Sequence, residues 1–363
     1  ASSLLNPAQR ERFAADVRAD YDALRREREG VQRVAPRLPI AAARENRLKI
    51  DWSSSIPPVP QVRGVQELHQ YPLRELVERI DWTPFFQTWE LSGHYPAILE
   101  DAEVGPAARA LFQDAHRLLE RIVCNNLLEA RAVFGFWPAN SVGDDIELYL
   151  DDDRTQPLAT WRTLRQQGPK TGDRPNLALA DYVAPSDSGR ADFVGAFAVT
   201  AGIGLDRLIA QFRADHDDYS AILAESLADR LAEAFAERLH ERVRREFWGY
   251  APNEALDNND LIHEAYQGIR PAPGYPACPD HTEKQTIFAL LDAEARIGIH
   301  LTESCAMLPG SSVSGYYFWR PEARYFGVGK IERDQVEDYA RRKGISVAEA
   351  ERWLSPNLAY ARS

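Results

Sequence analysis

Cysteine is scarce in this sequence of 363 residues, where only Cys124, Cys278 and Cys305 occur. The three residues lie far apart and form no Cys-x-x-Cys pair, so they predict neither a disulfide framework nor a zinc site. Free thiols in a reducing compartment are the simpler interpretation, and we therefore expect a cytoplasmic protein.

Signals for membranes and export are also missing. The sequence has no run of about 18 apolar residues, which is the length that a membrane-spanning helix needs. It has no signal-peptide pattern either. Its first residue is Ala1 rather than Met. We take this start as a weak indication that the sequence is a piece of a longer protein.

A basic surface is not expected, because the formal net charge is −12. Proteins that bind nucleic acid need clustered Lys and Arg, so the charge argues against a nucleic-acid partner. The eight histidines are scattered and form no His-x-x-x-His pair, so we expect no metal site in this chain.

The common catalytic motifs are absent. No Gly-x-Gly-x-x-Gly follows a strand pattern, which argues against a Rossmann nucleotide site. The Gly-Ser-Ser-Val-Ser-Gly run at 310–315 lacks the strand and helix that frame a nucleophilic serine. We therefore predict no catalytic residue in the chain itself.

Apolar periodicity predicts an α+β fold. Strand patterns come early and late, helices come in blocks between them, and regular strand–helix alternation is missing, so we expect a largely antiparallel sheet. The Pro-bearing stretch 31–62 is expected to run extended over the surface. Helices are predicted over 7–28, 106–122, 205–247, 282–297 and 334–354, a hairpin over 132–137 and 146–150, and further strands over 193–200, 313–319 and 325–328.

The most unusual segment surrounds Arg270. Four prolines and two glycines follow Tyr266 within fourteen residues, so the segment is stiff and poor in backbone donors. From composition alone, a rigid surface connector is as good an interpretation as a ligand-binding loop. The fixed cation of Arg270 and the rings of Tyr266 and Tyr275 favour a ligand that is zwitterionic and carries an aromatic base.

Several carboxylates could assist such a ligand, and each has a plainer interpretation. Glu233 and Glu237 lie four residues apart and share one face of the long predicted helix, which is also typical of a solvated surface. Asp81 precedes Trp-Thr-Pro and could simply begin a helix. Glu264 lies just before the stiff segment.

Several long and unusual motifs lie at 81–86, 138–140, 143–145, 195–200, 249–254, 270–284, 333–340 and 353–358. Together they resemble the C-terminal activation domain of cobalamin-dependent methionine synthase. The resemblance runs from about residue 35 to the end, and 1–34 resembles the linker helix that follows the family's cobalamin-binding domain. It implies one domain over 35–363, with a curved α+β fold and a twisted antiparallel sheet.

The resemblance also implies a function. The parent enzyme transfers a methyl group from methyltetrahydrofolate to homocysteine through cobalamin, whose oxidised cob(II)alamin state is inactive. This domain would bind S-adenosylmethionine and present its methyl group for reductive methylation of cob(II)alamin. Implied partners are the cobalamin domain and an electron donor, flavodoxin or a diflavin reductase. Cobalamin and zinc would be bound by other domains.

Site residues follow from the resemblance by position. Arg270 would meet the ligand carboxylate and Asp81 the ammonium group, while Ala272 would act through its backbone. Asp229 is a candidate contact with the cobalamin domain, although 203–207 is less acidic than the family pattern. The pocket would be completed by Glu233, Glu264, Tyr275 and Tyr325, the last of which is followed by phenylalanine where the family has a second tyrosine.

Two other functions stay open at this point. A freestanding S-adenosylmethionine-dependent methyltransferase would need a second pocket and, usually, a general base. A non-catalytic docking module would use the stiff segment only to recognise a partner protein.

Overall fold

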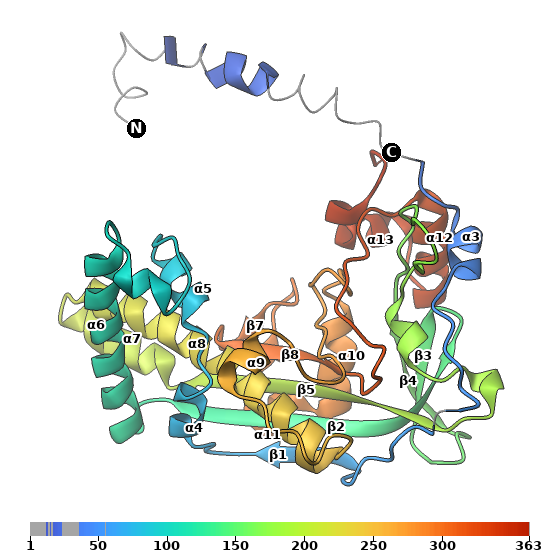
Figure 1. Ribbon diagram of the computed structural model, residues 1–363, viewed down its shortest axis with the longest axis horizontal. Helices are drawn as coiled ribbons and strands as arrows, with labels where there is room; N and C mark the ends of the chain where they lie inside the picture. Colours follow the sequence, from blue (N-terminus) through green and yellow to red (C-terminus); the bar gives the residue numbers. More distant parts are fainter. Residues whose placement is uncertain (1–11, 14, 16, 24–35, 55, 363) are drawn as a thin grey trace.

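The computed structural model describes residues 12–13, 15, 17–23, 36–54 and 56–362 (Figure 1). The described residues between 12 and 23 are helical, as the sequence predicts, and the rest of the expected linker helix lies outside the described residues. Among the described residues, no helix combines the length and the apolar character needed to cross a membrane.

An antiparallel sheet forms the centre of the molecule, in the order β4-β3-β2-β5-β8, with β1 also pairing β2. The long strands β2 and β5 cross the molecule, and the sheet turns upward at β3 and β4, which makes the domain curved (Figure 1). The strands are β1 (Gly64–Leu68), β2 (Glu129–Val142), β3 (Asp145–Tyr149), β4 (Pro157–Arg162), β5 (Asp192–Ile203) and β8 (Ser312–Tyr317).

Both faces of the central strands are buried, because side chains alternate between two separate hydrophobic clusters. Phe134 and Phe136 of β2 pack with α6, α7 and α8. Val133 and Trp137 face the opposite cluster, which contains residues of α10 and α11. These helices are α6 (Gly105–Cys124), α7 (Leu205–Ala214), α8 (Asp218–Arg242), α10 (Glu283–Leu291) and α11 (Ala293–Ile297).

A third cluster forms at the upturned end of the sheet. There α12 (Arg333–Lys343) packs on α13 (Val347–Trp353), and α3 (Ile40–Glu45) lies beside them (Figure 1). The shorter elements are α4 (Leu73–Val77), α5 (Trp82–Thr88), α9 (Asn258–Ile262), β6 (His300–Leu301) and β7 (Met307–Leu308).

The expected α+β class and the antiparallel sheet are confirmed, with three local corrections. The stretch 31–62 is not extended throughout, since it contains α3. Residues 325–328 do not form a strand. The first hairpin strand continues through Pro138, which pairs with Phe193 of β5. Pro138 is tolerated there because β1 pairing ends at Phe136 and β3 pairing begins at Ala139, so no strand on that side needs its missing N–H.

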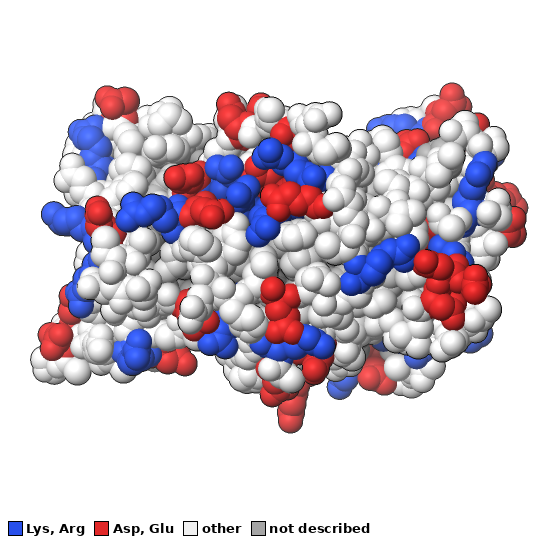
Figure 2. All heavy atoms as spheres, turned by 90° about the horizontal axis from the view of Figure 1, so that it is seen from below, with Lys and Arg blue, Asp and Glu red and all other residues white. Residues whose placement is uncertain are grey.

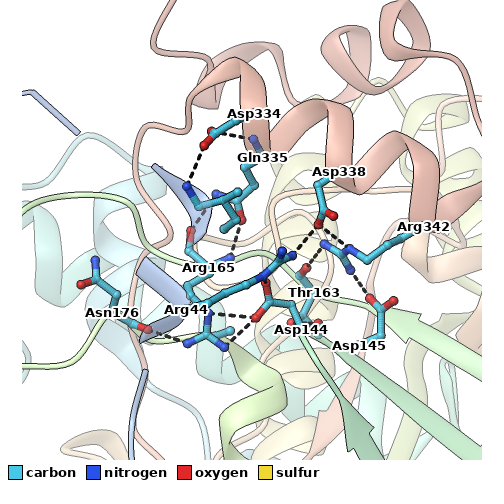
Figure 3. Close-up of polar contacts among 12 residues, drawn as sticks. Arg44, Asp144, Asp145, Thr163, Arg165, Asn176, Asp334, Gln335, Asp338 and Arg342 are labelled. Atoms are coloured by element: carbon cyan, nitrogen blue, oxygen red, sulfur yellow. Dashed lines mark hydrogen bonds and ion pairs between the residues drawn. The ribbon is translucent and has the colours of Figure 1, made fainter. Parts of the chain in front are cut away.

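A buried ionic network joins the upturned end of the sheet to α3 and α12 (Figure 3). The guanidinium of Arg165 donates to Asp144 Oδ1 from Nε at 2.8 Å and from Nη2 at 2.6 Å, and to Asp181 at 2.8 Å. Arg44 of α3 donates to Asp144 Oδ2 at 2.7 Å and to Asp338 of α12 at 2.5 Å. Asp144 therefore links two arginines from segments far apart in sequence.

Charges on the underside of the domain are mixed. Lys and Arg lie beside Asp and Glu on this face, with wide uncharged areas between them (Figure 2). No single sign of charge dominates the face shown, so this face does not offer the continuous positive surface that nucleic-acid binding requires.

Asp144→Ala should lower the free energy of unfolding by about 3 kcal/mol, because it leaves Arg165 buried with one of its two carboxylate partners missing. Urea denaturation measures the loss. The control is Asp152→Ala, which removes an exposed ion pair with Arg63 and should cost less than about 1 kcal/mol. Equal losses in the two variants would show that the network adds nothing to stability.

Candidate functional site

A pocket of about 330 Å³ opens between α5, α8, α9 and the stiff proline-rich loop that carries Arg270 and Tyr275. It brings together five of the predicted site residues, which come from positions up to 194 apart in the sequence (275 − 81). These five are Asp81, Glu233, Glu264, Arg270 and Tyr275. Arg79, Pro84, Arg230, Ala234, Glu237, Asn258, Leu261 and Ile262 complete the lining.

Helix α8 supplies one wall of this pocket. Glu233, Glu237 and His240 recur at spacings of four and three, so they lie on one face of the helix. Glu233 is exposed at the pocket, Glu237 is nearly buried, and His240 is fully buried. The face therefore runs from the solvent into the protein interior, although the sequence also allowed a fully solvated face.

Arg270 is held by three side chains. Its Nη2 donates to Glu237 Oε2 at 2.6 Å, and its Nη1 donates to the hydroxyl of Tyr266 at 2.7 Å. Nη1 also lies 3.3 Å from Nδ1 of His240. Burial opposes the charge of Arg270, but Glu237 and the surrounding tyrosines outweigh it and raise the pKa of the guanidinium. Arg270 is thus a permanent cation in a largely buried site.

His240 is the neutral member of this cluster. Burial lowers its pKa well below the usual value, and the charges of Arg244 and Arg270 lower it further. Its ring stacks on Tyr317 at 5.3 Å and meets the edge of Tyr266 at 4.9 Å. A neutral ring leaves Nδ1 as an acceptor for Arg270, with the proton on Nε2.

The stiff loop is fixed from behind by β8 and by Tyr325. The backbone N–H of Arg270 donates to the Tyr325 hydroxyl at 3.0 Å, and Tyr316 N–H donates to the carbonyl of Pro271 at 2.9 Å. Gly274 has φ +93°, and a Cβ there would lie 2.4 Å from the ring of His281, so only glycine fits. The loop is therefore an ordered wall and not a loose connector.

Two predicted residues lie outside the pocket lining. Ala272 is half-buried, and its carbonyl accepts from Tyr275 N–H at 3.2 Å. Tyr325 contacts the backbone of Arg270, and its hydroxyl lies 3.3 Å from that of Tyr266. In this structure both residues support the loop, and neither lines the cavity.

Asp81 meets both interpretations of its sequence context. It is the N-cap of α5, where Oδ1 accepts from Thr83 N–H at 3.0 Å, and it also lines the pocket.

Glu264 occupies the left-handed region at φ 55°, and burial raises its pKa while Arg270 opposes that shift.

Sequence reasoning missed three features of the pocket. Arg79 and Arg230 add two cations to its lining. His240 contacts Arg270 from α8, and only its spacing of three from Glu237 on a long helix could have indicated this.

A larger cavity of about 560 Å³ between α4 and the end of α6 has fewer charged residues, namely Arg74 and Glu129, so it lacks the convergent charges seen around Arg270.

The fold and the site together define a curved α+β domain with a pocket lined by residues of both charges. Residues 72–344 match the family model "Vitamin B12 dependent methionine synthase, activation domain". A crystal structure of the MetH reactivation domain bound to AdoHcy is 56% identical, with a TM-score of 0.88 over 90% of this chain and 100% of that chain. The chain belongs to the family of activation domains of vitamin B12-dependent methionine synthase, a methyltransferase.

His240 should make the protein less stable in acid. Its folded-state pKa is depressed, so the unfolded state takes up the proton first as the pH falls below the unfolded value of about 6.5. This contribution is complete above about pH 6.5 and falls by about 1.4 kcal/mol per pH unit below it, until the folded-state pKa is reached.

Urea denaturation at about pH 7.5 and about pH 5.5 measures the effect. Wild type should lose about 1 kcal/mol more than His240→Asn over that interval. His116 and His281, whose pKa values burial also lowers, are present in both proteins, so their contributions cancel. Equal losses would contradict the neutral, buried state of His240.

Proposed function

We propose that this domain binds S-adenosylmethionine in the pocket at Arg270 and presents its methyl group for reductive methylation of cob(II)alamin. The observation that carries the proposal is the unfilled hydrogen-bonding capacity of Arg270. Its three partners use three of the five N–H donors, and Nε–H and one Nη2 hydrogen have no hydrogen bond among the described residues. Two donors on one guanidinium suit a carboxylate.

The other charges of the pocket fit the rest of such a ligand. S-adenosylmethionine carries a carboxylate, an ammonium and a sulfonium, so it needs one cation and several negative groups. Asp81, Glu233 and Glu264 supply carboxylates, and we assign the ammonium to Asp81. The exposed ring of Tyr275 offers a face for the sulfonium or the base. Ala272 would contribute its backbone, and Tyr325 would hold Arg270 in place.

The similar crystal structure supports this ligand class, because that domain binds AdoHcy, the demethylated form of the proposed ligand. The nucleophile would be supplied by the cobalamin of a neighbouring domain, after one-electron reduction by flavodoxin or a diflavin reductase. This chain needs no acid or base of its own, since its residues bind the methyl donor and orient it toward that domain.

The arrangement within the parent enzyme is also proposed. Residues 1–34 would form the linker after the cobalamin domain, and 35–363 the activation domain. Asp229 of α8 is exposed and accepts from the Ser311 hydroxyl at 2.7 Å, so its position is fixed for a docking contact. The three cysteines are unpaired, as expected for a cytoplasmic enzyme.

Arg270→Ala should weaken S-adenosylmethionine binding by about 1.5–3 kcal/mol, because a charge-assisted hydrogen bond is lost. Isothermal titration calorimetry measures the change. Arg213→Ala, which alters an exposed arginine on α7, is the matched control and should bind as wild type does. Unchanged affinity in Arg270→Ala would remove Arg270 from the ligand site.

Mixing the domain with a separate cobalamin domain, a reductant and S-adenosylmethionine should convert the absorption spectrum of cob(II)alamin to that of methylcobalamin. Omission of this domain is the control and should leave the spectrum unchanged. Methyl transfer without any cobalamin domain would instead indicate a freestanding methyltransferase. S-adenosylmethionine at one hundred times its dissociation constant should raise the free energy of unfolding by about 2.7 kcal/mol, which a thermal shift assay detects. No shift in the melting temperature would favour a docking module that does not bind this ligand.

A further inference from the structure

We infer that Glu237 is a positioning residue, which holds the guanidinium of Arg270 in the orientation that receives the ligand carboxylate. His240 and Tyr266 complete this support. The inference rests on the proposed binding of S-adenosylmethionine and adds to it a residue that acts through Arg270.

The support is built on two rigid elements. Glu237 and His240 lie one turn apart on α8, whose apolar side is packed against the sheet. Tyr266 lies four residues before Arg270, and its ring faces the guanidinium at 5.7 Å from the ring centre. Arginine has a long and flexible side chain, so three contacts at 2.6, 2.7 and 3.3 Å remove freedom that a ligand would otherwise have to remove.

Within the part of the chain that the structure describes, Glu237 has no partner other than Arg270 that would explain its burial. Its side chain is 12% exposed, and Arg270 is its only ion-pair partner among the described residues. Oε1 is buried and has no hydrogen bond there. Burial of a carboxylate with only one ion-pair partner costs folding free energy. We attribute the retention of Glu237 to its contact with Arg270, which fixes the guanidinium before the ligand binds.

Glu237 also lines the pocket, but its one hydrogen bond among the described residues is to Arg270. Glu233, one turn earlier on α8, is exposed at the pocket and could reach a ligand directly. The two glutamates thus differ in depth, and the deeper one contacts the guanidinium. This difference predicts that loss of Glu237 affects only ligands that use Arg270.

The experiment compares two variants of equal charge. Glu237→Ala removes the acceptor for Nη2, whereas Glu237→Gln keeps an acceptor oxygen at the same place. Both lose the negative charge, so the ratio of their dissociation constants isolates the positioning effect. Calorimetry measures this ratio for S-adenosylmethionine and for decarboxylated S-adenosylmethionine, which lacks only the carboxylate. Glu225→Ala, at the other end of α8, is the matched control, and circular dichroism confirms that each variant is folded.

The dissociation constant of Glu237→Ala divided by that of Glu237→Gln should be about ten or more for S-adenosylmethionine. The same ratio should be close to one for the decarboxylated ligand. Wild type and Glu225→Ala should bind equally. A ratio near one for both ligands, or the same large ratio for both, would overturn the inference.

These outcomes separate the inference from the proposed function. Wild type could bind S-adenosylmethionine and Arg270→Ala bind it weakly, while Glu237→Ala and Glu237→Gln have equal dissociation constants. That result would overturn only the positioning role of Glu237. If wild type does not bind S-adenosylmethionine at all, both are lost. Tyr266→Phe offers a second check that leaves α8 intact, and it should weaken S-adenosylmethionine more than the decarboxylated ligand.

Discussion

The ion pair between Arg270 and Glu237 joins the loop that carries Arg270 to helix α8, and both residues line the pocket. One partner belongs to a proline-rich loop that cannot form regular structure, and the other to the longest helix of the domain. Because the pair is nearly buried, its 2.6 Å contact is little screened by water. The loop is thereby fixed to α8 on one side and to β8 on the other.

The rest of the fold explains why this pair can form where it does. α8 packs along β5 and β8, so its buried face is determined by the sheet, and the Glu233–Glu237–His240 face turns toward the loop. The second ionic network, around Asp144 and Arg165, lies at the upturned end of the sheet and has a different role, since it joins α3 and α12 to the sheet (Figure 3).

Local patterns in the sequence account for much of the fold. The apolar spacing of 205–247 predicts α7 and α8, and the turn at 143–145 predicts the β2–β3 hairpin, because both signals depend on near neighbours. The strand expected at 325–328 was wrong, since a short apolar run forms a strand only where a partner strand is available. The contact of Glu237 with Arg270 spans 33 residues and depends on packing, so spacing alone could not predict it. The family resemblance identified Arg270, Asp81 and Glu264, which the structure places around one pocket, but whether each contacts the ligand stays a prediction.

We propose that Arg270 receives the carboxylate of S-adenosylmethionine in the pocket beside α8. A crystal structure of this chain with S-adenosylmethionine tests it most directly. We predict density for the ligand between α8 and the loop 270–276, with its carboxylate on Nε and Nη2 of Arg270 and with the contact between Arg270 and Glu237 retained. Ligand density elsewhere, or a carboxylate that displaces Glu237 from Arg270, would contradict it.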